Sequence, residues 1–258
     1  MTAEVLHQIA RWLGCQKILL AECGSTNDEA ARLARAGARH GTVVIAEQQR
    51  AGRGRDGHVW TSPPGGLWMS AVLRPSLPLV DVPPMTLAIG IGVCEAARQA
   101  GAAAVLKWPN DVLVGGAKLA GVLVEAQSQG NRLDAVIVGI GINLNNEVPE
   151  HAISLAGARG EAVDREAFLG SLLASVERWV DRYVASGIEA IIPAWQDRMA
   201  IGLAARATID GAPLVGSVHG LDLDGALLLR DQTGRIHRVR SGDVEVLRTA
   251  APEMLSAM

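Results

Sequence analysis

The order of apolar and polar residues along the chain predicts an alternation of strands and helices. Short apolar runs between turn residues are typical of strands, and they occur over residues 17–22, 42–49, 67–73, 105–108, 111–114, 117–126 and 133–144. Apolar residues at helical spacing predict helices over residues 3–13, about 84–100, 164–185 and about 189–199, together with an alanine-rich helix that ends at Gly37. Residues 146–160 are predicted to form an irregular loop.

The pattern changes after residue 203. From Ala205 onward, short apolar runs alternate with tight turns at Asp210-Gly211, Asp224-Gly225 and Thr233-Gly234. Several short strands at close spacing are typical of a small β-barrel. We therefore expect two domains, residues 1–203 and residues 204–258.

Composition narrows the classes of protein. The chain has 258 residues and is 49% hydrophobic, so it can bury a large core. A net charge of −3 argues against a general nucleic-acid binder, which normally carries a basic face. The three cysteines form no C-x-x-C pair, and the N-terminus lacks the pattern of a signal peptide. Since no apolar run reaches the roughly 18 residues of a membrane span, we expect a soluble, cytoplasmic protein.

The loop over residues 51–60 carries the first candidate chemistry. Gly52-Arg53-Gly54-Arg55-Asp56-Gly57 fits the letters of a dinucleotide fingerprint, but no helix is predicted after it, and a P-loop ending is absent. Glycines let backbone N–H groups approach a ligand, and guanidinium groups grip carboxylate or phosphate. Arg53, Arg55 and His58 together favour capture of an anion. An ordinary solvated basic loop remains the alternative.

Two further segments point to a ligand. Along residues 136–145, alternation places Gly139, Gly141 and Asn143 on one face of a strand, where a ligand or a packed helix can come close. In the segment from Lys107 to Glu125, two lysines flank a Pro-Asn-Asp turn and a hairpin. Its aspartate can hold a metal, accept a hydrogen bond, or simply form the turn.

These motifs, in order along the chain, resemble the signatures of the biotin–protein ligases. The resemblance covers about residues 17–248 and rests on Gly24-Ser25-Thr26-Asn27, Gly52-Arg53-Gly54-Arg55 with Trp60, Lys107-Trp108-Pro109-Asn110-Asp111, Lys118-Leu119-Ala120-Gly121 and Gly139 to Asn143. It implies an α+β fold: a catalytic domain of mixed sheet and helices, similar to class II aminoacyl-tRNA synthetases, and a small SH3-like C-terminal barrel. It also implies ATP-dependent ligation of biotin, through biotinyl-5'-AMP, to a lysine of a biotin carboxyl carrier protein.

The resemblance also assigns roles by position. It places biotin against Ser25, Thr26, Asn27, Gln49, Arg53, Gly54, Arg55, Lys118, Gly139 and Gly141. It places ATP or the adenylate against Arg55, His58, Trp60, Lys107, Asn110, Asp111, Lys118 and Asn143. Lys118, Arg55 and Arg53 would be the catalytic cations, and Asp111 would meet the Mg²⁺ that accompanies ATP. The chain departs from many relatives at His58 and Asp56, which bears on how tightly the loop retains the adenylate.

Other interpretations remain at this point. A lipoate ligase or octanoyl transferase has a similar fold, although the Arg-Gly-Arg loop and Lys107–Asp111 argue against both. A sensor that binds biotin or nucleotide without transferring it is the non-enzymatic alternative. Because the Ser-Thr-Asn signature begins at residue 25 and the residues before it fit one helix, we expect a monofunctional enzyme without a DNA-binding domain. No nucleic-acid or membrane partner is expected, and the sequence leaves both a monomer and a homodimer open.

Overall fold

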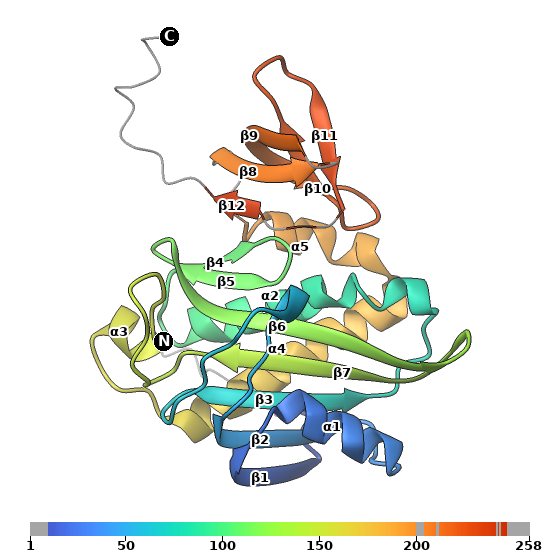
Figure 1. Ribbon diagram of the computed structural model, residues 1–258, viewed down its shortest axis with the longest axis vertical. Coiled ribbons are helices and arrows are strands. Elements are labelled where there is room, and N and C mark those ends of the chain that lie inside the picture. Colours follow the sequence, from blue (N-terminus) through green and yellow to red (C-terminus); the bar gives the residue numbers. More distant parts are fainter. Residues whose placement is uncertain (1–9, 200–203, 210–211, 241, 243, 247–258) are drawn as a thin grey trace, which may run out of the picture.

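The computed structural model describes residues 10–199, 204–209, 212–240, 242 and 244–246. Its larger part is a seven-stranded sheet with the strand order β1-β2-β3-β7-β6-β5-β4 (Figure 1). The first two strands are parallel, and all other neighbours in this sheet are antiparallel. The strands are β1 (Gln16–Cys23), β2 (Thr42–Gln49), β3 (Leu67–Leu73), β4 (Ala104–Lys107), β5 (Asp111–Val114), β6 (Ala117–Gln129) and β7 (Arg132–Ile142).

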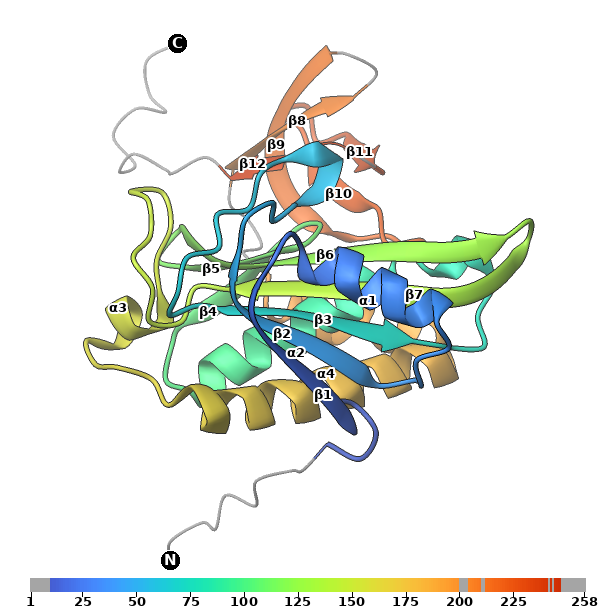
Figure 2. The same cartoon turned by 60° about the horizontal axis from the view of Figure 1, so that its bottom comes forward.

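Helices cover the two faces of this sheet unequally. The long helices α2 (Met85–Gln99) and α4 (Arg165–Ser186) lie on one side, and the shorter α1 (Thr26–Arg35) lies on the other (Figure 2). Successive side chains of β7 point to opposite faces of the sheet. Val136, Val138 and Ile140 pack in the main core, on the side of α2 and α4. Ala135 and Ile137 pack on the other side, with alanines of α1. The same alternation places Gly139 and Gly141 on the α1 side, with Gly139 against Asn27 in the first turn of that helix and Gly141 against Trp60.

A second, smaller sheet follows. It is antiparallel, with the order β11-β10-β9-β8-β12, and such a sheet is consistent with the expected SH3-like domain. Its strands are β8 (Ala204–Ile209), β9 (Ala212–Leu221), β10 (Leu227–Arg230), β11 (Ile236–Val239) and β12 (Val244–Val246). The α+β fold class is confirmed. The predicted boundary at residue 203 lies outside the described residues, so the division into 1–203 and 204–258 stays our proposal.

Two hydrogen bonds between described residues join the motif segments of the large sheet to the small one. The Trp108 indole N–H donates to the carbonyl of Gly225 at 2.9 Å. Nη2 of Arg55 donates to the carbonyl of Gly242 at 2.7 Å. The small domain therefore contacts both the loop of residues 52–60 and the Lys107–Asp111 segment.

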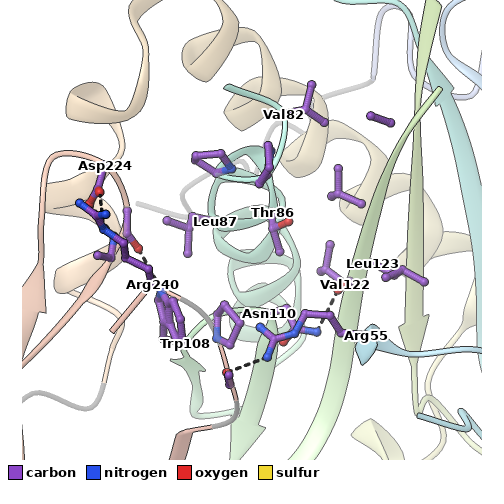
Figure 3. A pocket seen from close by; sticks show the side chains of 18 of the residues that line it. Arg55, Val82, Thr86, Leu87, Trp108, Asn110, Val122, Leu123, Asp224 and Arg240 are labelled. Atoms are coloured by element: carbon purple, nitrogen blue, oxygen red, sulfur yellow. Dashed lines mark hydrogen bonds and ion pairs between the residues drawn. The ribbon is translucent and has the colours of Figure 1, made fainter. Parts of the chain in front are cut away.

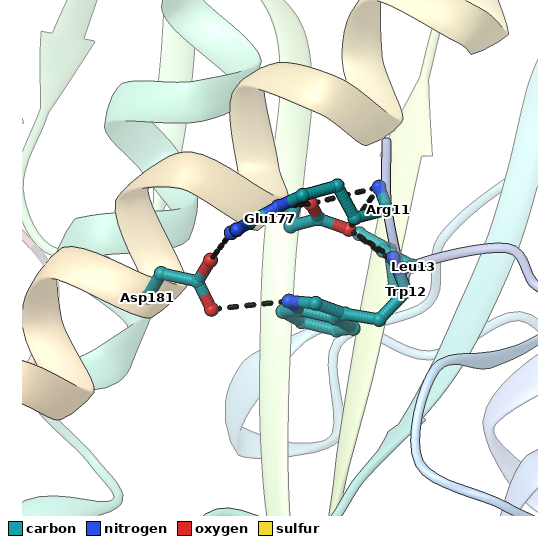
Figure 4. Close-up of polar contacts among 5 residues, drawn as sticks. All are labelled: Arg11, Trp12, Leu13, Glu177 and Asp181. Carbon is teal, nitrogen blue, oxygen red and sulfur yellow. Dashed lines mark hydrogen bonds and ion pairs between the residues drawn. The ribbon is translucent and has the colours of Figure 1, made fainter. Parts of the chain in front are cut away.

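The predicted helix over residues 3–13 is wrong where it can be checked. Residues 3–9 lie outside the described residues, and residues 10–13 are not helical. The backbone N–H groups of Arg11, Trp12 and Leu13 all donate to the Glu177 carboxylate, at 2.7 to 2.9 Å (Figure 4). Because a distant side chain takes these donors, they are not available for helical hydrogen bonds. We call Arg11–Leu13 the N-terminal strap.

Two other predictions need smaller corrections. The expected irregular loop contains a short helix, α3 (Leu155–Arg159), whose N-cap Ser154 accepts a hydrogen bond from the backbone N–H of Gly157. The expected helix over 189–199 is divided into a 3₁₀ turn (Ile188–Ala190) and α5 (Ile192–Gln196). Two further 3₁₀ turns occupy Arg55–Gly57 and Leu79–Asp81.

One helical stretch, Leu79–Gln99, is long and apolar enough to cross a membrane by length and composition, with a mean hydropathy of 1.4 over its most apolar part. The sequence analysis predicted a helix over about 84–100 but not that it is long and apolar enough to span a membrane, because that test considered only uninterrupted apolar runs. In the fold, 61% of that part is buried. Such burial is expected of a core helix in a globular domain.

Candidate functional site

A cavity lies on the α1 side of the large sheet, where the predicted motifs converge. Residues from α1, the loop of residues 52–60, β5, β6 and β7 line it. All the predicted site residues line it except Lys107 and Asn143: Ser25, Thr26, Asn27, Gln49, Arg53, Gly54, Arg55, His58, Trp60, Asn110, Asp111, Lys118, Gly139 and Gly141. The structure thus brings together segments that are far apart in the sequence.

One end of the cavity is polar but uncharged. The backbone N–H and the hydroxyl of Thr26 both approach Oε1 of Gln49, at 2.7 and 3.0 Å, and Nε2 of Gln49 donates to Ser62 at 2.8 Å. The hydroxyl of Ser70 lies 2.7 Å from that of Thr26 and 2.5 Å from Oδ1 of Asn27. Hydrogen bonds between these side chains therefore fix the positions of the donors and acceptors.

The other end is cationic. Nζ of Lys118 lies 2.6 Å from Oδ1 of Asp111 and 5.0 Å from the centre of the Trp60 ring system. Nζ of Lys107 approaches the second oxygen of the same carboxylate at 3.4 Å. One carboxylate, with only 11% of its side chain exposed, thus faces two ammonium groups, which leaves positive charge for an anionic ligand.

The glycine face of β7 is in close contact with two side chains. A Cβ atom added at Gly141 would come within 2.6 Å of Nε1 of Trp60, and one added at Gly139 would overlap the Asn27 amide. Trp60 also lies against Gly121 of β6, and its buried Nε1 has no hydrogen-bond partner among the described residues. The glycines therefore provide the room for Trp60 and for the first turn of α1. The contact of Gly139 with Asn27 agrees with the helix-packing interpretation, and both glycines also line the cavity in which a ligand would bind.

Both arginines of the loop have protein partners. Arg53 forms a two-pronged ion pair with Asp28 of α1, at 2.7 and 2.8 Å. This hydrogen bonding lowers the pKa of Asp28 and raises that of Arg53. Nε of Arg55 lies 3.1 Å from Asp56, whose positive φ of 54° helps to form the tight turn. The exposed His58 follows this turn. Arg53 is thus held against α1, and Arg55 against its neighbour and the small domain.

A larger cavity of about 480 Å³ adjoins the site, between the large sheet and the small domain. Arg55, Asn110, Val122 and Leu123 line both cavities. Figure 3 shows Arg55, Asn110 and Trp108 at one end of this larger space. Arg55 consequently stands between the two cavities.

Two predicted site residues, Lys107 and Asn143, lie outside the cavity lining. Lys107 reaches it only through Asp111. Asn143 is buried, and its amide lies 3.4 Å from the backbone carbonyl of Lys118 and 3.1 Å from the side chain of Asn146. The structure therefore places Asn143 as a support for the Lys118 segment rather than in the lining.

The sequence analysis missed Ser62, Ser70 and Glu125. Ser70 is the single polar residue in an otherwise apolar strand, and alternation from Trp68 would have placed it on the site face. Glu125 could have been placed there too, because it is four residues after Gly121 on the same strand. Ser62 lies in a loop, and nothing in the sequence points to its contact with Gln49.

A metal ion has few ligands available here. Among the described residues, no group of three or more His, Cys, Asp or Glu side chains could hold a metal. Within the same part of the chain, Asp111 is the only carboxylate that lines the smaller cavity. One carboxylate suits Mg²⁺ that arrives bound to phosphates, which usually needs one or two protein ligands.

The pocket thus has a neutral polar end and a cationic end. Several known proteins are similar to this chain in sequence. The model of the biotin/lipoate A/B protein ligase family matches residues 23–143. The chain is 38% identical over 234 residues to a biotin–[acetyl-CoA-carboxylase] ligase of Paracoccus denitrificans, covering 84% of this chain and 95% of that protein. It is also 38% identical over 232 residues to the bifunctional ligase/repressor BirA of Bacillus subtilis, covering 86% of this chain and 71% of that protein.

A solved structure agrees. The biotin protein ligase from Aquifex aeolicus in complex with biotin and ATP superposes with a TM-score of 0.78 at 30% identity, covering 91% of this chain and 100% of that one. The chain therefore belongs to the biotin/lipoate A/B protein ligase family, and within it to the biotin protein ligases.

Proposed function

We propose that this protein uses ATP to join biotin to a lysine of a biotin carboxyl carrier protein, through biotinyl-5'-AMP. The observation that carries the proposal is the polarity of the pocket. Its fixed neutral groups at Thr26, Asn27 and Gln49 suit the ureido ring of biotin, and Lys118 suits a carboxylate and a phosphate. The relatives named as biotin ligases support the same activity.

The first half-reaction brings two anions together. A carboxylate oxygen of biotin attacks the α-phosphorus of ATP, an acyl–phosphate bond forms, and pyrophosphate leaves. Fixed cations offset the repulsion between the reacting groups. Lys118 is the best placed of these, because Asp111 orients its ammonium group at 2.6 Å and Trp60 covers it. Arg53 and Arg55 come from the loop that would cover the adenylate.

The second half-reaction needs no side-chain nucleophile. The uncharged amine of the carrier lysine attacks the acyl carbon of biotinyl-AMP, an amide forms, and AMP leaves as the proton is released. The adenylate is a mixed anhydride that water would hydrolyse, so a closed loop protects it. Mg²⁺ bound to ATP would supply further charge neutralisation, with Asp111 as its protein ligand.

The setting of the enzyme is part of the proposal. A net charge of −3 supports action without a nucleic-acid partner, and three free cysteines in the described part of the chain suit the reducing cytoplasm. No membrane partner is invoked. The monofunctional assignment stays a prediction, and both a monomer and a homodimer are compatible with the proposal.

The proposal is tested by labelling a purified biotin carboxyl carrier domain. We expect the carrier to gain one biotin only when the protein, biotin and ATP are all present. Lipoic acid in place of biotin is the matched control and should give no product. Transfer of lipoate instead, or tight binding of biotin without transfer, would favour the lipoate ligase or the sensor.

A glycine variant tests the placement of the biotin slot. Gly141→Val would put a branched side chain where the Trp60 indole lies. We therefore expect Trp60 to be displaced and biotin affinity to fall about tenfold or more. Calorimetry with biotin measures this change. Gly170→Val is the control, because a Cβ atom there meets nothing within 4 Å. Unchanged biotin affinity in folded Gly141→Val would contradict the placement of biotin on this face.

A further inference from the structure

We propose that Glu125 is a positioning residue for biotin recognition, because it fixes the orientation of the Asn27 amide. The inference rests on the proposed function, since it takes biotin as the ligand of the pocket. Glu125 does not line the cavity. It acts through Asn27, which does line it and has only 4% of its surface exposed.

The contacts hold the amide from both sides. Nδ2 of Asn27 donates to Oε2 of Glu125 at 2.6 Å, and Oδ1 accepts from the hydroxyl of Ser70 at 2.5 Å. Asn27 belongs to α1, Ser70 to β3 and Glu125 to β6, so three elements meet at this side chain. The missing side chain of Gly139 provides the space, because a Cβ atom there would overlap the amide.

Of these two partners, only Glu125 can impose the direction of the amide. A hydroxyl both donates and accepts, so Ser70 could face either end of the Asn27 side chain. A carboxylate accepts only, and a reversed amide would set Oδ1 against an oxygen of Glu125. The carboxylate therefore decides that Asn27 presents its remaining N–H and its remaining lone pair to a ligand in one arrangement.

Glu125 also connects this amide to the loop over the pocket. Its Oε1 lies 3.8 Å from Nη2 of Arg53, whose main partner is Asp28. The guanidinium group thus lies near two carboxylates and offsets their charge. As a result, one side chain of β6 contacts residues of both the ureido end and the covering loop.

The decisive variant is Glu125→Gln, which keeps the size of the side chain but lets its end both donate and accept. Because a hydrogen bond to a charged group is lost and the amide is free to reverse, we expect biotin to bind about tenfold more weakly. ATP affinity and the midpoint of thermal unfolding should stay near the wild-type values. Glu29→Gln is the control, because Glu29 is an α1 carboxylate that pairs only with Arg32 among the described contacts.

A double-mutant cycle with Asn27→Ala separates positioning from general support. If Glu125 acts through Asn27, Glu125→Gln should change biotin affinity little once the amide is absent. Equal losses of biotin and ATP affinity together with a lower unfolding midpoint would overturn the inference, as would additive losses in the cycle. Wild-type-like biotin binding by Glu125→Gln would overturn it and leave the proposed function standing. A wild-type protein that binds no biotin would overturn both.

Discussion

Replacement of Lys118 by alanine is expected to slow the formation of biotinyl-AMP by about 100- to 1000-fold, the usual effect of removing one group that stabilises developing charge. The variant loses the ammonium group that lies between the Asp111 carboxylate and the Trp60 ring. Among the described residues, no other lysine lines the cavity. Lys107 pairs with the other oxygen of Asp111 and lies outside the lining, so it cannot take the place of Lys118. Biotin-dependent exchange of pyrophosphate into ATP, without any carrier, measures this step alone.

The fold should tolerate this change. The Lys118 side chain is about one-third exposed, and its removal leaves Asp111 paired with Lys107. Lys17→Ala, at an exposed lysine of β1, is the matched control and should leave the exchange rate unchanged. A folded Lys118→Ala protein that forms the adenylate at a near-normal rate would contradict the role given to this lysine.

Replacement of Glu177 by alanine should have the largest effect on stability, about 3 kcal/mol in the free energy of unfolding. The carboxylate is nearly fully buried and accepts three consecutive backbone N–H groups of the N-terminal strap, for which the described residues offer no other partner. Chemical denaturation measures the loss. The control is Glu166→Ala, at an exposed position of the same helix. Like most surface substitutions, it should change stability by less than about 0.5 kcal/mol.

The contribution of Glu177 to the stability of the fold should also decrease as the pH is lowered. Burial alone would raise the pKa of Glu177, but the hydrogen bonds from Leu13, Trp12 and Arg11 outweigh it, and the pKa lies below its ordinary value of 4.5. A carboxyl group with a lowered pKa in the folded state stabilises the fold fully above that ordinary value, and the contribution is lost as pH falls through the folded-state pKa. The difference in the free energy of unfolding between wild type and Glu177→Ala should therefore shrink as the solution is made more acidic than pH 4.5. A difference that stays constant to low pH would contradict the ionic role of this group.

Elements whose bounds are set by the local pattern of residues were predicted from the sequence, whereas a segment held by a distant side chain was not. The strands Thr42–Gln49 and Leu67–Leu73 were predicted with their observed bounds, because each is a short apolar run between clear turn residues. The helix Met85–Gln99 was predicted within one residue at each end. The strap was predicted as helix, since its apolar spacing is helical and its partner Glu177 lies more than 160 residues away in sequence.

The same distinction holds at the site. The motifs gave most of the lining, because each motif places its residues within a few positions of a strand end or a turn. They did not give the contacts between motifs, such as Arg53 with Asp28 or Asn27 with Glu125. Nor did they show that the Trp60 indole lies over Gly141. Such contacts depend on how the strands pair across the sheet, which no single segment encodes.

The two hydrogen bonds between the domains have a consequence for how the small domain can evolve and be probed. Both acceptors, the carbonyls of Gly225 and Gly242, belong to the main chain. A backbone carbonyl is present whatever side chain its residue carries, so the side chains around these turns can change while the contacts persist. The two glycines themselves are constrained, because their φ values of 83° and 102° favour glycine. Alanine substitutions elsewhere in the small domain would consequently leave both bonds in place. The bonds would be revealed by removal of the donors Trp108 and Arg55, or by alanine at Gly225 or Gly242, which would strain the turn that presents each carbonyl.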